Sequence, residues 1–117
     1  MKKIILIMAI VLMASSTFGA SISLKAIWTP NTEADMAGYN LYRTDGTRLK
    51  LNPALIPHPP VLPYNFIVSV PDNSSGTMTF VLTAVDSIGN ESPDSNTASR
   101  PYDLVPPAKP VGLTVGF

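Results

Sequence analysis

Hydrophobic and polar residues alternate along several short stretches of the chain, with the period of two that is typical of β-strands. In the stretch 79–85, Phe80, Leu82 and Ala84 fall on one face and the residues between them fall on the other. The same alternation predicts further strands over 21–28, 38–43, 48–51 and 64–70. The residues of 38–43 and 64–70 expected to face the core are Tyr39, Leu41, Phe66, Val68 and Val70. Because a half-buried strand buries every second residue, these stretches predict an all-β fold of packed sheets.

Turn residues separate these strands. Asp86 to Ser92 supplies Gly, Asn and Ser directly after 79–85, and a second polar run begins at Asp94, so we expect a hairpin there. Segment 52–63 carries five of the twelve prolines. Because proline cannot donate to a strand ladder, this segment is expected at a sheet edge or in a loop.

Asp45-Gly46 is a strong signal for a two-residue hairpin between 38–43 and 48–51. In the register that such a turn implies, Tyr42 lies opposite Leu49 and on the same face as Leu51. These three residues therefore form a candidate surface contact. A bulge that turns the second strand toward the core is the alternative interpretation.

Two motifs make the pattern more specific. Residues 80–92 read FVLTAVDSIGNES and residues 38–43 read GYNLYR. They resemble the F strand, turn and G strand, and the C strand, of bacterial fibronectin type III domains. The resemblance covers 21–103 and implies an immunoglobulin-like β-sandwich of about seven strands with Trp28 in its core. It further implies a non-catalytic module used for spacing, adhesion or protein–protein assembly.

Residues 1–20 have the three parts of a secretory signal peptide. Lys2 and Lys3 come first, an apolar run follows over 4–14, and small residues lead to Ala20. We therefore expect a secreted or periplasmic protein with no membrane attachment after cleavage at Gly19 or Ala20. A retained short membrane anchor is the alternative.

Charge and cysteine content restrict the partners. Loss of Lys2 and Lys3 with the signal leaves six basic and eight acidic residues, a balance that argues against nucleic acid. The chain contains no cysteine, so neither a disulfide framework nor a cysteine-based zinc site is expected. Packing alone must stabilise the fold.

The polar residues do not suggest catalysis. Glu33 and Asp35 lie in a polar loop, and His58, the single histidine, lies in the proline-rich segment. Paired carboxylates need a cleft and different environments before they act as acid and base. We expect no catalytic site, no metal site and no cofactor. Oxygen ligands at 86–91 leave a calcium site open, but turn capping is the favoured role.

Aromatic residues offer one other function, binding of polysaccharide. Tyr42, Tyr64 and Tyr102 are the candidate exposed aromatics. Trp28 shares a face with Leu24 and is expected in the core rather than as a sugar platform.

The tail, residues 104–117, resembles the first strand of a following domain of the same family. We find no equivalent of the family's first strand before 21–28, so the segment that resembles it lies at the other end of the chain. Val111, Leu113 and Val115 alternate in the tail and form a candidate assembly strand that one copy donates to a neighbour, head to tail. A disordered remnant and a tail packed on its own sheet are the alternatives.

Overall fold

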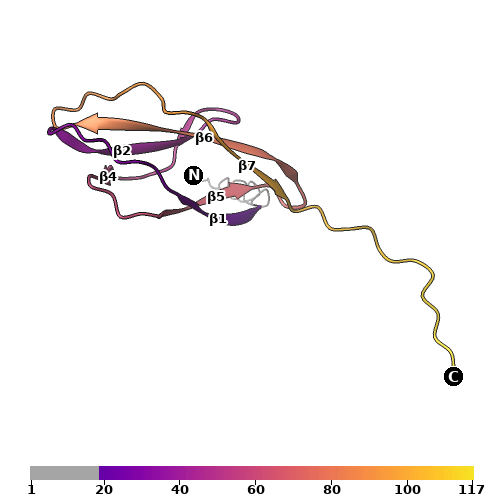
Figure 1. Ribbon diagram of the computed structural model, residues 1–117. Helices are drawn as coiled ribbons and strands as arrows, with labels where there is room; N and C mark the ends of the chain where they lie inside the picture. The colour runs from indigo at the N-terminus through magenta and orange to yellow at the C-terminus, as the bar shows by residue number, and fades with distance from the viewer. Residues whose placement is uncertain (1–18) are drawn as a thin grey trace, which may run out of the picture.

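The computed structural model describes residues 19–117, and within this range the chain forms seven strands and no helix. Their bounds are β1 Ala20–Ala26, β2 Met36–Arg43, β3 Leu49–Lys50, β4 Ile56–Pro57, β5 Tyr64–Val70, β6 Ser75–Asp86 and β7 Ala98–Asp103. β1 and β5 form a two-stranded sheet, and the other strands form a five-stranded sheet in the order β3-β2-β6-β7, with β4 also on β2 (Figure 1). The predicted all-β fold is confirmed. The predicted signal peptide lies almost entirely outside the described residues.

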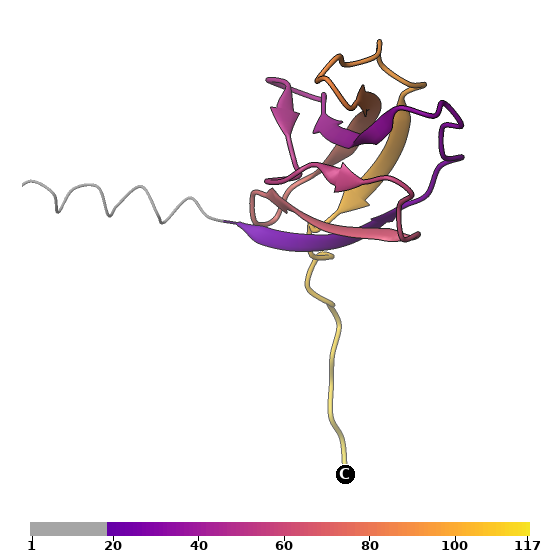
Figure 2. The same cartoon turned by 90° about the vertical axis from the view of Figure 1, so that its left-hand side faces the viewer.

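The two sheets face one another as two layers (Figure 2). β2 lies at the centre of the larger sheet, between β6 on one side and β3 and β4 on the other. Its inward side chains include Tyr39 and Leu41, which are 1% and 4% exposed. Both were predicted to face the core, and this prediction is confirmed.

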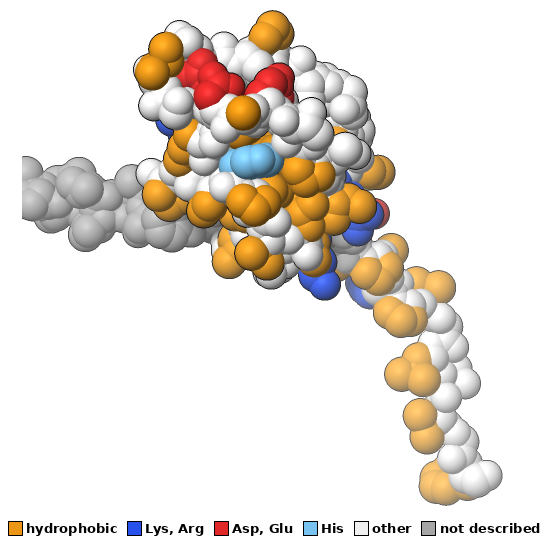
Figure 3. Space-filling model, turned by 60° about the vertical axis from the view of Figure 1, so that its left-hand side comes forward, with side chains coloured by type: hydrophobic (Ala, Val, Ile, Leu, Met, Phe, Trp, Pro, Cys, Tyr) orange, Lys and Arg blue, Asp and Glu red, His pale blue; other side chains and the backbone are white. Residues whose placement is uncertain are grey.

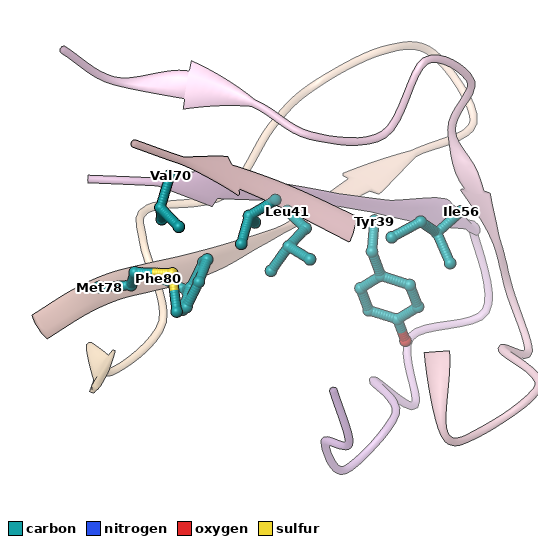
Figure 4. Packing of buried hydrophobic residues seen from close by; sticks show 7 residues of the cluster. Tyr39, Leu41, Ile56, Val70, Met78 and Phe80 are labelled. Carbon is teal, nitrogen blue, oxygen red and sulfur yellow. The ribbon is translucent and has the colours of Figure 1, made fainter. Parts of the chain in front are cut away.

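The core lies between the layers and takes side chains from both (Figure 4). Its buried members are Tyr39, Leu41, Ile56, Val68, Val70, Met78 and Phe80. Burying such a side chain stabilises the fold by roughly 1.5–3 kcal/mol. In β5 the inward set is the predicted one, with Val68 and Val70 buried and Phe66 packed beside them.

The predicted register between 38–43 and 48–51 is wrong by one residue. Tyr42 lies opposite Lys50, and Leu49 lies opposite Arg43. The reason is Asp45, whose carboxylate accepts hydrogen bonds from the Arg43 side chain at 2.9 and 3.1 Å and from the backbone N–H of Thr79 at 3.1 Å. Gly46 does not take the positive φ that the two-residue turn needs. The connection is therefore longer than two residues. Leu51, which follows β3, packs against the core.

The turn after β6 forms as predicted. Gly89 has a φ of 95°, and the Asp86 carboxylate accepts hydrogen bonds from the backbone N–H groups of Ile88 and Asn90 at 3.1 and 2.8 Å. The strand that follows begins only at Ala98. Before it, Ser92 and Ser95 imitate a strand, since each hydroxyl accepts a β6 backbone N–H at 2.9 Å.

Asn52 connects the proline-rich segment to the central strand. It is 2% exposed, and its carbonyl oxygen accepts the backbone N–H of Leu41 at 2.7 Å. Its amide nitrogen donates to the Asn40 side chain at 2.9 Å and to the Ala54 carbonyl at 3.0 Å. A buried amide with these partners fixes where segment 52–63 lies on the sheet.

We predict that Asn52→Ala destabilises the protein by about 1–3 kcal/mol, because the buried N–H of Leu41 loses its acceptor. Urea unfolding followed by tryptophan fluorescence measures the change. Asn65→Ala, at an exposed position of β5, is the matched control and is expected to change stability by less than about 0.5 kcal/mol. Equal losses from the two variants would contradict the role given to Asn52.

Candidate functional site

An open groove of about 610 Å³ lies between the edges of the two sheets. One wall is formed by 23–28, the second half of β1 and the residues after it, and the other by 95–100 at the start of β7. Its apolar lining consists mainly of Leu24, Trp28, Leu41, Phe66, Phe80 and Leu82. The hydrophobic interior of the sandwich is therefore open to solvent along this side.

The outer edge of β1 borders this groove. β1 pairs with β5 over its whole length, from Ala20 opposite Val70 to Ala26 opposite Tyr64. Among residues 19–117 no strand pairs with its other edge. Backbone N–H and C=O groups that face such an edge are available to another strand.

The composition of β1 leaves this edge unprotected. β1 contains no proline, and Lys25 is its single charged residue. β7, across the groove, contains Pro101, which has no N–H to donate. The better acceptor of an incoming strand is therefore β1.

Trp28 lies where the groove meets the core. Its ring packs edge to face against Tyr39, with centroids 5.2 Å apart, and against Tyr64 at 6.5 Å. Its Nε1 is buried and has no hydrogen-bond partner in the described part of the chain. Trp28 therefore serves as an apolar wall of the groove, packed against the core as expected.

The tail leaves the end of β7 and runs away from both sheets (Figures 1 and 2). Leu104 still belongs to the fold, because it packs on the core and its N–H donates to the Ser74 carbonyl at 2.8 Å. From Pro106 onward every residue is exposed. The predicted assembly residues Val111, Leu113 and Val115 are 85%, 86% and 89% exposed. A space-filling view shows apolar side chains along this segment (Figure 3).

A second group of side chains, a polar cluster, lies on the outer face of the larger sheet and consists of Asn40, Tyr42, Thr83 and Glu91. One oxygen of Glu91 accepts hydrogen bonds from the hydroxyls of Tyr42 at 2.6 Å and Thr83 at 2.5 Å, and from the Asn40 amide at 3.4 Å. The bond from Thr83, and after it the bond from Tyr42, lowers the pKa of Glu91. The hydrogen bond between Tyr42 and Glu91 also raises the pKa of Tyr42.

Arg48 completes this polar cluster. Its guanidinium lies 4.0 Å from the centre of the Tyr42 ring and forms a bidentate ion pair with Asp94 at 2.9 and 3.0 Å. The Tyr42 ring is thus covered on one face, and its hydroxyl is engaged. These contacts disfavour Tyr42 as a stacking platform for sugar.

The other candidate tyrosines are also packed. Tyr64 stacks on Phe66 with ring centroids 6.2 Å apart, and the Tyr102 hydroxyl lies 3.3 Å from that of Ser74. Both residues pack against the core cluster.

The structure does not bring the three predicted surface-contact residues together. Tyr42 joins the polar cluster, whereas Leu51 packs against the core. Leu49 is 57% exposed and lies opposite Arg43, so it is on the other face of the sheet from Tyr42. The alternative interpretation, a second strand turned inward, agrees with these positions.

The residues considered for catalysis or metal binding have structural contacts. His58 Nδ1 lies 2.9 Å from the Tyr39 hydroxyl, which also accepts the Asn31 N–H at 2.9 Å. The Asp86 carboxylate is engaged by the turn, and that of Glu91 by the polar cluster. Over residues 19–117, no three His, Cys, Asp or Glu side chains are grouped so as to hold a metal ion.

Comparison of the chain with protein-family models, curated proteins and solved structures finds no match. In the part of the chain that the structure describes, no helix has the length and apolarity needed to cross a membrane.

Sequence reasoning missed both the groove and the polar cluster. The groove depends on how the two sheets meet, which local alternation does not report. A signal for the cluster does exist, since Asn40, Tyr42 and Thr83 occupy the outward positions of two strands expected in one sheet.

We predict that Glu91 adds a pH-dependent contribution to stability. Because its folded pKa is lowered, the contribution is present above the unfolded pKa and is lost as pH falls through the folded value. Glu91→Gln should therefore lower Tm at pH 7, and the difference from wild type should shrink below the ordinary glutamate pKa of 4.5. Thermal unfolding by circular dichroism from pH 7 to 3 measures it. An identical difference at every pH would refute the prediction.

Proposed function

We propose that this chain is an exported, non-catalytic β-sandwich module of the fibronectin type III kind, and that it functions in protein–protein assembly. It binds its partner by accepting an extended strand along the outer edge of β1. The observation that carries this proposal is the coincidence of an unpaired, unprotected strand edge with an apolar groove beside it.

The strand order supports the family assignment. Under this proposal β1 and β5 correspond to strands B and E, and the order β3-β2-β6-β7 corresponds to C′-C-F-G. Strand A would then lie along the edge of β1 on which no strand of residues 19–117 pairs. Fold does not fix function, so the assembly role depends on the groove itself.

The use of the charged side chains supports a non-catalytic role. Asp45 is held by Arg43, Asp86 by its own turn, and Asp94 by Arg48. Glu91 is held by three donors on the outer sheet. Groups held in this way act as turn caps and cross-strand ties.

Export is supported by the basic, apolar and small-residue order of residues 1–20. β1 begins at Ala20, so cleavage after Gly19 would keep the whole of the first strand.

The experiment uses a chain that begins at Ala20 and ends at Val105. Residues 106–117 are exposed and make no hydrogen bond within the described structure, so their removal leaves the core intact. This shortened chain is panned against a displayed library of random ten-residue peptides. Enrichment of peptides with apolar residues at every second position is expected, because alternate side chains would enter the groove.

Ala98→Trp provides the blocking variant, because Ala98 lines the groove and the larger side chain would fill it. Ser69→Trp, at an exposed position of β5 outside the groove, is the matched control. We expect the enriched peptides to lose at least tenfold in affinity for the first variant and to bind the second as they bind wild type. The absence of enriched peptides, or equal binding by all three proteins, would overturn the proposal.

A further inference from the structure

We propose that the strand accepted by β1 is the tail of a second copy of this chain, paired antiparallel along the groove. This inference rests on the proposed strand-accepting function and adds the identity, direction and register of the donor. Its basis is the match between two features that the fold leaves unsatisfied in each copy, the open edge of β1 and the exposed apolar tail.

The tail has the side-chain pattern that the groove requires. Val111, Leu113 and Val115 share one face of an extended chain, and Gly112, Thr114 and Gly116 share the other. The first set would enter the apolar space between the sheets, while the small residues would face solvent. Pro110 cannot donate a hydrogen bond, so pairing begins at Val111.

The register follows from pairing the first donor residue with the last residue of β1. β1 has seven residues, and alternate ones point inward, namely Ala20, Ile22, Leu24 and Ala26. Directly opposed residues on paired strands share a face. With Val111 opposite Ala26, Leu113 lies opposite Leu24 and Val115 opposite Ile22. Leu113 then enters the groove beside Leu24, one of its lining residues.

Geometry keeps the tail out of its own groove in this direction. β7 ends at Asp103, opposite Ser75, and this is the end of the sandwich where β5 finishes and β1 begins. An antiparallel strand must enter at the other end, beside Ala26. The spacer 104–110 reaches at most about 24 Å when fully extended. A seven-residue strand is itself about 24 Å long, which leaves no residues for the reversal.

A neighbouring copy presents no such obstacle. The spacer leaves one molecule at the end where its β1 begins and enters the next molecule at the end where that β1 finishes. Donor and acceptor surfaces are different, so each copy that donates still offers its own groove. Repetition gives an open head-to-tail chain of molecules, in which each β1 becomes a central strand.

The test is light scattering after size-exclusion chromatography on the chain from Ala20, over a wide concentration range. We expect a mass that rises with concentration. Val111→Ser/Leu113→Ser/Val115→Ser should keep the mass of one chain throughout, because it removes the groove-filling side chains. Thr114→Ser/Gly116→Ser changes the outward face of the same segment and should assemble like wild type.

A synthetic peptide of residues 104–117 provides the second arm. It should bind the shortened chain 20–105 at one peptide per chain and, in tenfold excess, return wild type to the mass of one chain by occupying every groove. The Ala98→Trp chain should bind it at least tenfold more weakly.

Three results would overturn the inference. They are a single-chain mass for wild type at every concentration, growth that survives the triple serine change, and failure of the peptide to bind chain 20–105. If chain 20–105 enriches library peptides but ignores its own tail, the strand-accepting function stands and only the donor is wrong. If it binds neither, both proposals fail.

Discussion

The structure depends on one constraint, which is that one of the two layers over the hydrophobic core has only two strands within residues 19–117. β1 and β5 face a larger sheet of five strands, and two strands are too few to close both edges of the layer. The interior is consequently exposed beside β1, where Leu24, Trp28 and Phe66 line an open groove. A two-stranded sheet has little stability by itself, so β1 and β5 depend on packing against the larger sheet. A third strand on β1 would satisfy its backbone and shield its apolar residues together.

Elsewhere in the fold, polar side chains form hydrogen bonds that join the loops and turns to the strands. Asn52 ties the proline-rich segment to β2, and Asp86 closes the turn after β6. Ser92 and Ser95 continue the ladder along β6 with their hydroxyls, and Glu91 joins the outer face of the larger sheet through three donors. The edge of β1 and the tail differ from these satisfied groups. The edge of β1 exposes backbone N–H and C=O groups, and the tail exposes alternating apolar side chains.

Local patterns predicted the strands well where the feature depends only on the sequence of the strand itself. β5 has the predicted bounds, and the inward residues of β2 are the predicted ones. The predictions were less accurate for strand bounds and registers, which depend on pairing with another strand. β6 begins at Ser75, four residues before the predicted start, because Ser75 to Met78 pair with β7. The β2–β3 register was wrong because Asp45 bonds to the distant Thr79. Asn52 and Glu91 gave no local signal, since their partners come from other strands.

The central claim, antiparallel strand donation between copies, is tested most directly by cross-linking, because the chain contains no cysteine. Lys25→Cys in an acceptor chain is mixed with a mass-tagged donor chain that carries either Gly112→Cys or Gly116→Cys, and the disulfide between unlike chains is measured. Antiparallel pairing places residue 112 opposite Lys25 and residue 116 about 13 Å further along the strand. Cross-linking is therefore expected with Gly112→Cys and not with Gly116→Cys. A reversed preference, equal yields or no disulfide between unlike chains would contradict the account.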